Sequence, residues 1–394
     1  MKKAFYMMAA AAIALSSCSS EETTDVAKST AISFRPTVGF NSRGAELNNT
    51  NFNDMWVYAY DLKATTGAGN GFEGEKFTKQ GTSNDFLPDT PLFWQAGSEL
   101  RFFAINPVKE NWHGTLEIAK TGASFSNVSI PTNIEDQKDL VIGSASAKAT
   151  NHMDGTGVGL TLNHILSQIN FKAVNTNKRL TYHIAAIRIK HAKNTDSYTF
   201  NPTSSQTGVW AGNPSGDVTY ELDFKKNPIV LDGTTGKSEK FLTHEGHGAM
   251  LVPQSLTPWN GAEVVENTAP FDGGSYIELL VNVRFTNDAY VYPKKANGNE
   301  DYGWIAVPLP TNNASNDKAE WKMGNKYIYT LNLSEGCGKV DPVDPNPEGG
   351  GKVEPNGTTD PKPGANIFGK PIKFTVTLSP WTSNPDENGT NIQM

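Results

Sequence analysis

Residues 158–171 read VGLTLNHILSQINF, and this stretch decides the fold class. Val158, Leu160 and Leu162 occupy alternate positions, and an apolar run from Ile165 to Phe171 follows them. Alternation with a period of two residues is typical of a half-buried β-strand, because successive side chains point to opposite faces. Similar patterns recur along the chain between clusters of Gly, Asn, Asp and Pro, which favour turns. The sequence therefore predicts an all-β protein built as a sandwich or a barrel.

The size and charge of the chain limit its organisation and its partners. A length of 394 residues predicts about two domains, which we place at residues 44–173 and 174–340, although no linker marks the boundary between them. The net charge of −7 and the lack of a basic patch argue against a nucleic-acid partner. With only two cysteines, Cys18 and Cys337, the fold is expected to depend on core burial and strand pairing rather than on disulfides.

The N-terminus is expected to be an export and anchoring signal. Residues 1–17 combine two lysines with an apolar run that is too short to span a membrane, as in a secretory signal peptide. The segment LSSC at 15–18 resembles a bacterial lipobox, which implies cleavage before Cys18 and its acylation, with palmitate among the acyl groups. Such a lipid would hold the protein at the outer membrane and cell surface. An ordinary signal peptide with a chance cysteine is the less favoured alternative.

Two strands with matching patterns lie at opposite ends of the mature chain. Each has an apolar face and a polar face, so either could fill the same kind of groove in a sheet. The apolar residues of the first strand, in the segment 18–43, and of the last strand, in the segment 365–394, are Ile32, Phe34, Val38 and Phe40, and Ile372, Phe374, Val376 and Leu378.

Arg43 offers a way to separate the first strand from the rest of the chain. It lies in the polar segment NSRGA at 41–45, a plausible substrate for a trypsin-like protease. Removal of the first strand would expose a groove and unpaired strand edges, which a strand from another subunit could fill. The Pro- and Gly-rich linker at 341–364 is long enough to carry the last strand to a neighbour if it is extended. A contact of this head-to-tail kind generates a filament.

Alternation alone favours a simpler interpretation, in which both segments are ordinary strands of their own domains and Arg43 is a surface loop residue.

A family resemblance reverses that preference. The chain resembles the fimbrillin family, the lipoprotein subunits of type V pili, in segments that follow the family's order along the chain. Besides the Cys18 lipobox and ISF at 32–34 followed by Arg43, these segments are MWVYAY at 55–60, LRFFAINP at 100–107, DLV at 139–141, LTLNHILSQINF at 160–171, LVPQ at 251–254, YIYTL at 327–331 and FTVTLSPW at 374–381.

The resemblance implies two transthyretin-like β-sandwich domains and a C-terminal donor strand. It also implies a lipidated precursor, removal of the first strand by an arginine-specific protease, and polymerisation with copies of itself and other pilus subunits. Arg43 fits the cleavage role best. Arg35 is the rival, but Pro36 follows it, and proline after the scissile bond blocks trypsin-like enzymes. The long Pro- and Gly-rich insert before the last strand is not expected in every member of the family.

No enzymatic chemistry is expected from the motifs. The segment HEGH at 244–247 falls short of the zinc-protease pattern, whose histidines are four residues apart, and its glycines favour a loop. His164 lies in an apolar strand and is interpreted as a structural residue. We therefore predict no catalytic residues, no metal and no cofactor. The alternative function is a monomeric surface lipoprotein that binds glycans or host ligands through Trp210, Trp259 and Trp304; a surface hydrolase is the weakest candidate.

Overall fold

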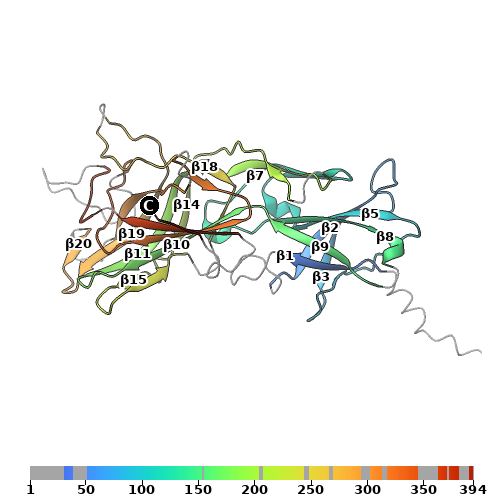
Figure 1. Cartoon of the computed structure of the whole chain (residues 1–394), viewed down its shortest axis with the longest axis horizontal. Coiled ribbons are helices and arrows are strands. Elements are labelled where there is room, and N and C mark those ends of the chain that lie inside the picture. The colour runs from blue at the N-terminus through green and yellow to red at the C-terminus, as the bar shows by residue number, and fades with distance from the viewer. Residues whose placement is uncertain are drawn as a thin grey trace, which may run out of the picture. The chain divides into compact units, whose positions relative to one another are not determined.

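The computed structural model of the chain describes most of the sequence from residue 31 onward (Figure 1). The described residues are 31–38, 51–152, 155–203, 207–243, 248–265, 269–293, 302–312, 317–344, 363–370, 372–380 and 390–393. Cys18, Phe40, Arg43 and the HEGH segment lie outside them, as does most of the linker predicted at 341–364.

Two compact units make up the chain. The described residues of the first unit fall within 31–36, 53–104 and 144–161, and those of the second within 37–52, 105–143 and 162–394. Each unit combines segments that are distant in the sequence. The domain boundary at residue 173 stays a prediction.

The first sheet closes on itself as a barrel, with the strand order β1-β4-β3-β2-β5-β8-β9 (Figure 1). Its strands are β1 (Phe34–Val38), β2 (Asp54–Asp61), β3 (Phe72–Lys79), β4 (Phe86–Pro88), β5 (Glu99–Asn106), β8 (Val141–Lys148) and β9 (Val158–His164). Closure removes the free edges that an open sheet would present to other chains.

Two larger sheets make up most of the second unit. In the first of them the order is β16-β10-β23-β24-β25, and β17 also pairs with β10. In the second the order is β14-β11-β19-β20, and β15 and β21 pair with β11 and β19. The strands of the first are β10 (Ser167–Asn175), β16 (Ser238–Phe241), β17 (Ala249–Leu251), β23 (Asn325–Asn332), β24 (Lys373–Pro380) and β25 (Thr390–Gln393). Those of the second are β11 (Leu180–Ala192), β14 (Val218–Asp223), β15 (Ile229–Asp232), β19 (Tyr276–Phe285), β20 (Tyr290–Tyr292) and β21 (Gly303–Pro308).

The remaining elements are short. Two small sheets contain β6 (Thr115–Ala119), β7 (Gly122–Ser129), β12 (Thr195–Phe200) and β13 (Val209–Trp210), and β18 (Gln254–Leu256) and β22 (Ala319–Trp321). The helices of the described residues are the 3₁₀ turns η1 (Lys109–Trp112), η2 (Ile134–Asp136) and η3 (Ala149–Asn151). None of them has the length and apolar character needed to cross a membrane.

The all-β prediction is confirmed, and the pattern that led to it can be followed in the core. Val158, Leu160 and Leu162 of β9 are buried while Gly159 and Thr161 are exposed. In β10, Ile169 and Phe171 are fully buried, because this central strand is covered on both faces. Burial of these apolar rows drives both units to fold.

Candidate functional site: the first and last strands

The apolar face of β1 is buried in the barrel. Ile32, Phe34, Pro36 and Val38 are buried, whereas Arg35 and Thr37 between them are exposed. The period of two residues in the sequence therefore becomes an inner and an outer face of the strand. The barrel depends on this strand both for closure and for part of its core.

Phe34 is the central contact of that face. Its ring lies 4.9 Å from the ring of Phe77 and 5.0 Å from the ring of Phe102, and both pairs meet edge to face. Edge-to-face pairs contribute about 0.5–1.5 kcal/mol each beyond their burial. Loss of β1 would leave the Phe34 position empty between two large aromatic rings.

The backbone of β1 pairs on both sides. On one side Phe34 lies opposite Phe86 of β4, and the N–H of Ile32 donates to the Leu92 carbonyl at 2.7 Å. On the other side the N–H of Val158 donates to the Ser33 carbonyl at 2.8 Å. Pro36 has no N–H to contribute. One of the backbone positions of β1 therefore cannot donate a hydrogen bond to a neighbouring strand.

Arg35 points away from the core. Its guanidinium forms an ion pair of 2.6 Å with Asp85, and the hydrogen bond from Arg35 lowers the pKa of that carboxyl. The residue lies in the middle of a paired strand and precedes Pro36, so the peptide bond after it is a poor protease substrate. Cleavage after Arg43 stays a prediction, because that residue lies outside the described part of the chain.

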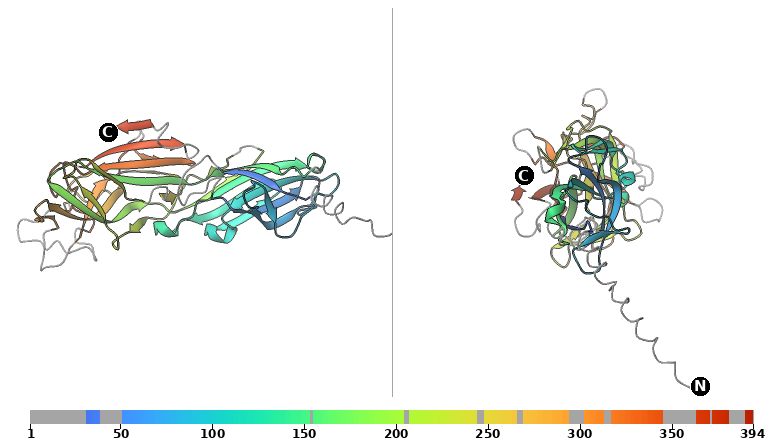
Figure 2. Two further views of the ribbon diagram at one scale, coloured as in Figure 1. Left: turned by 90° about the horizontal axis from the view of Figure 1, so that it is seen from below. Right: turned by 90° about the vertical axis from the view of Figure 1, so that its right-hand side faces the viewer.

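The last apolar strand, β24, is paired within the second unit (Figure 2). It runs antiparallel to β23, from Lys373 opposite Asn332 to Pro380 opposite Asn325, and its other edge carries β25. Val376 is fully buried and Ile372 nearly so, but Phe374 and Leu378 are half-buried. The apolar face of β24 is therefore less completely covered than that of β1.

Backbone hydrogen bonds join the two ends of the predicted linker. The segments 335–340 and 364–370 run antiparallel as a short ladder, in which the Cys337 N–H donates to the Phe368 carbonyl at 3.0 Å and the Val340 N–H to the Ala365 carbonyl at 2.9 Å. The Gly364 N–H returns a bond to the Val340 carbonyl at 3.1 Å. We call this pairing the linker ladder. Nothing in the sequence pattern predicted it, because the Gly-rich flanks show no alternation.

Cys337 lies within the linker ladder and is buried. Its sulfur is 3.6 Å from the hydroxyl oxygen of Tyr182, and burial raises the pKa of the thiol to about 11, with the Tyr182 contact acting in the opposite direction. A nucleophilic cysteine needs a lowered pKa and access to solvent. The geometry agrees with the interpretation of Cys337 as a non-catalytic thiol.

A buried pair of carboxyl groups lies beside the linker ladder. Glu278 of β19 is fully buried, and no described donor is within hydrogen-bond distance of either of its oxygens. Asp341, the first residue of the predicted linker, is also buried and accepts hydrogen bonds from Tyr276 at 3.1 Å and from the Val343 N–H at 2.7 Å. Burial and then a hydrogen bond with Asp341 raise the pKa of Glu278 well above its usual range. Two carboxyl groups can share such a bond only if one of them carries a proton, and that one is Glu278.

Two basic residues of β11 act to lower the pKa of Glu278, but the pKa remains raised. The nitrogens of Arg188 and Lys190 are each 3.8 Å from the same Glu278 oxygen, which is beyond hydrogen-bond distance. Arg188 also binds Glu221 at 3.0 Å and lies over the ring of Trp304. For Asp341, burial acts to raise the pKa, but the hydrogen bonds from Glu278 and from the backbone outweigh it, so its pKa is lowered.

We expect Glu278→Gln to remove a pH dependence of stability. Because the folded pKa of Glu278 is raised, the folded chain keeps a proton that the unfolded chain has released, and stability falls as pH rises through that window. The slope approaches about 1.4 kcal/mol per pH unit for one proton. Urea unfolding between about pH 6 and 9 measures it. Equal slopes for the variant and the parent would show that Glu278 is ionised in the fold.

Two of the described histidines lie against carboxylates. His164 Nδ1 lies 2.8 Å from an Asp139 oxygen with both side chains buried, and His191 Nδ1 lies 3.1 Å from Asp217. Among the described residues there is no group of three side chains that could hold a metal ion.

The aromatic residues considered for sugar binding do not form an open platform. Trp259 and Trp304 are 2% and 3% exposed, and Trp210 is half-buried with its indole N–H donating to the Ile165 carbonyl. They pack as core and edge residues of the second unit. Their burial removes the sequence argument for glycan stacking.

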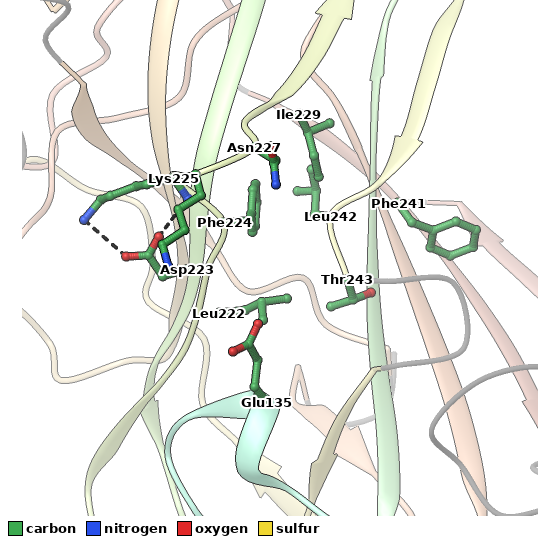
Figure 3. A pocket seen from close by; sticks show the side chains of 11 residues that line it. Glu135, Leu222, Asp223, Phe224, Lys225, Asn227, Ile229, Phe241, Leu242 and Thr243 are labelled. Atoms are coloured by element: carbon green, nitrogen blue, oxygen red, sulfur yellow. Dashed lines mark hydrogen bonds and ion pairs between the residues drawn. The ribbon is translucent and has the colours of Figure 1, made fainter.

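A cavity of about 660 Å³ lies beside the connection from β14 to β15 (Figure 3). Leu222, Phe224 and Leu242 supply its apolar part. Its charged groups are partly paired with each other, as in the 3.4 Å ion pair between Lys225 and Asp223.

Comparison with solved structures found weak similarity to putative cell adhesion proteins. One from Bacteroides ovatus is 13% identical with a TM-score of 0.41, and the match covers 77% of this chain and 92% of that one. One from Bacteroides uniformis is 13% identical with a TM-score of 0.41, covering 89% and 98%. One from Bacteroides eggerthii is 11% identical with a TM-score of 0.39, covering 89% and 96%. No curated protein gave a significant sequence match.

The comparison with protein-family models identifies the family of the chain. The model of the fimbrillin-like family matches residues 43–355, which is most of the chain. The match spans the barrel strands β2 to β9 and the second unit as far as the predicted linker. The chain therefore belongs to the fimbrillin-like family.

Proposed function

We propose that the chain is a structural subunit of type V fimbriae, made as a lipoprotein precursor and assembled by exchange of a strand between subunits. Membership of the fimbrillin-like family supports a pilus or adhesin role at the cell surface, with other pilus subunits as partners and no enzymatic activity. In the finer proposal the signal peptide directs export, and acylation of Cys18 anchors the precursor at the outer membrane. An arginine-specific protease then cuts after Arg43, and the product polymerises and supports adhesion.

The position of β1 carries this proposal. The strand closes the barrel and fills part of its core, yet it belongs to the short N-terminal piece that a cut after Arg43 would separate from Asn51 onward. After the cut, only non-covalent contacts would hold β1 in place. Its departure would leave an apolar groove between two unpaired strand edges, which favours the addition of a new strand.

The last strand is a suitable donor for that groove. In its own sheet β24 leaves Phe374 and Leu378 half-buried, so transfer into the barrel would bury more of its apolar face. Each square ångström of apolar surface removed from water contributes about 25 cal/mol. This gain offsets part of the cost of breaking the pairing of β24 with β23 and β25.

The test begins with the lipid-free precursor and a trypsin-like protease. We expect a new N-terminus at Gly44, followed over hours by a ladder of stable multimers. A second protein that lacks residues 372–394 should be cut at the same bond and form no ladder. A precursor that resists cutting there, or one that is cut and stays monomeric, would instead favour a monomeric surface lipoprotein that binds glycans or host ligands.

A further inference from the structure

The start of the predicted linker continues a sheet of the second unit. In the register of that sheet, Arg188 of β11 lies opposite Glu278 of β19, and Glu278 lies opposite Ala306 of β21. The backbones of Ala306 and Lys339 then exchange two hydrogen bonds, of 2.7 Å and 2.9 Å. One strand of the linker ladder is therefore the next neighbour of β21. Asp341 follows two residues later, and its carboxyl group reaches that of Glu278.

The Asp341 carboxylate organises the point at which the linker leaves the ladder. One of its oxygens accepts hydrogen bonds from the hydroxyl of Tyr276 at 3.1 Å and from the N–H groups of Val343 at 2.7 Å and Asp344 at 3.0 Å. Val340, the preceding residue, makes the last backbone hydrogen bonds of the linker ladder. Movement of the Asp341 carboxylate would therefore disturb the first turn of the linker and the end of the ladder together.

Glu278 has a second set of partners on the side away from Asp341. One of its oxygens lies 3.8 Å from a nitrogen of Arg188 and 3.8 Å from that of Lys190, just beyond hydrogen-bond distance. A protonated Glu278 donates to Asp341, but an ionised one has no proton to donate. Because the side chain is fully buried, an ionised carboxylate needs a new partner to replace its hydration. A small movement toward β11 supplies two.

The surroundings of the pair contain further titratable groups. Burial raises the pKa of the Tyr276 and Tyr292 hydroxyls, so both stay neutral, and it raises the pKa of the Cys337 thiol to about 11. The charged groups around the pair are Arg188 and Lys190 of β11, Glu221 of β14, and Asp341 and Asp344 of the linker. Glu278 is the buried carboxyl whose pKa is raised, so its charge changes as pH rises above the usual carboxyl range.

We propose that Glu278 is a pH-dependent switch on the linker. When it is protonated, it binds Asp341 and the linker ladder stays closed. When it ionises, it turns to Arg188 and Lys190, and Asp341, now beside a second negative charge, moves toward water and opens the end of the ladder. The inference concerns contacts within one chain and does not depend on the assembly of subunits.

The sign of the pH dependence follows from the proton count. The closed ladder keeps a proton that the open ladder releases, because only the closed form holds Glu278 against Asp341. Opening therefore becomes more favourable as pH rises, by up to about tenfold per pH unit for one proton. The effect begins above the usual carboxyl range and ends at the raised pKa of the closed form. Below that range both forms are protonated, and opening does not depend on pH.

Hydrogen–deuterium exchange of the lipid-free chain between about pH 5 and 9 measures this opening. After correction for the intrinsic pH dependence of exchange, we expect the protection of peptides that cover 335–344 and 364–370 to fall by up to about tenfold per pH unit. A peptide from β10, at 167–175, serves as the internal reference and should keep its protection. Parallel loss in the ladder and in β10 would show unfolding of the whole unit and would overturn the switch.

Three variants assign the effect to Glu278. Glu278→Gln still donates to Asp341 but cannot ionise, so its ladder protection should not change with pH. Glu221→Gln, the matched control, removes the other carboxylate at Arg188 and should respond to pH as the parent does. Lys190→Met removes one of the alternative partners and should shift the response to higher pH. A response that persists in Glu278→Gln, or that is unchanged in Lys190→Met, would overturn the proposal.

Discussion

Phe34→Ala is expected to destabilise the first unit by about 3–5 kcal/mol, the usual range for truncation of a buried phenylalanine. Phe34 is fully buried and contacts two aromatic rings, so the substitution removes apolar burial and both edge-to-face contacts and leaves a cavity. Denaturant unfolding, followed through the transition of the first unit, measures the effect. The cleaved variant should also lose its first strand faster than the parent.

Arg35→Ala is the matched control for this prediction. It alters the neighbouring residue of the same strand but removes only an exposed ion pair, so a change of no more than about 1 kcal/mol is expected. If Phe34→Ala lowered the free energy of unfolding of the first unit by no more than Arg35→Ala does, β1 would contribute little to the stability of the barrel. Its removal would then not expose a groove in need of a new strand.

Val376→Asp is expected to abolish growth of the ladder while leaving cleavage intact. Val376 is fully buried in its own sheet and would be buried again in the barrel groove of a neighbour in the proposed assembly. A carboxylate cannot enter either site without loss of hydration that no partner restores. The variant should therefore be unable to donate its strand. Size-exclusion chromatography of the cleaved protein measures the outcome.

Mixing experiments separate a failed donor from a misfolded protein. The variant keeps an intact groove, so it should accept a strand from the parent and then end the growing chain. Mean multimer length should fall as its fraction in the mixture rises. Lys373→Ala, at an exposed position of the same strand, should assemble as the parent does. A variant that neither grows nor shortens mixed multimers would indicate a damaged groove rather than a failed donor.

The sequence could predict the strands but not their neighbours. Period-two alternation at residues 32–38 predicted which side chains face the core, because burial on one face imposes that pattern locally, whereas at 372–378 only Ile372 and Val376 are buried. Closure of the barrel depends on pairs such as Phe34 with Phe86, which local patterns do not encode. The only local signal for the carboxyl pair was Glu278 itself, a charged residue within the long apolar strand at 276–285. Its partner Asp341 lies in a segment whose composition predicted a Pro- and Gly-rich linker without a core of its own.

The linker ladder has a kinetic consequence. In assembly by strand exchange, β24 must first leave β23 and β25, and the linker gains its full reach only when the pairing of residues 335–340 with 364–370 opens. Opening is a unimolecular event, whereas the meeting of two subunits depends on concentration. Once collisions are frequent, a higher concentration of subunits cannot accelerate growth, so the rate at which these pairings open sets an upper limit on the speed of assembly.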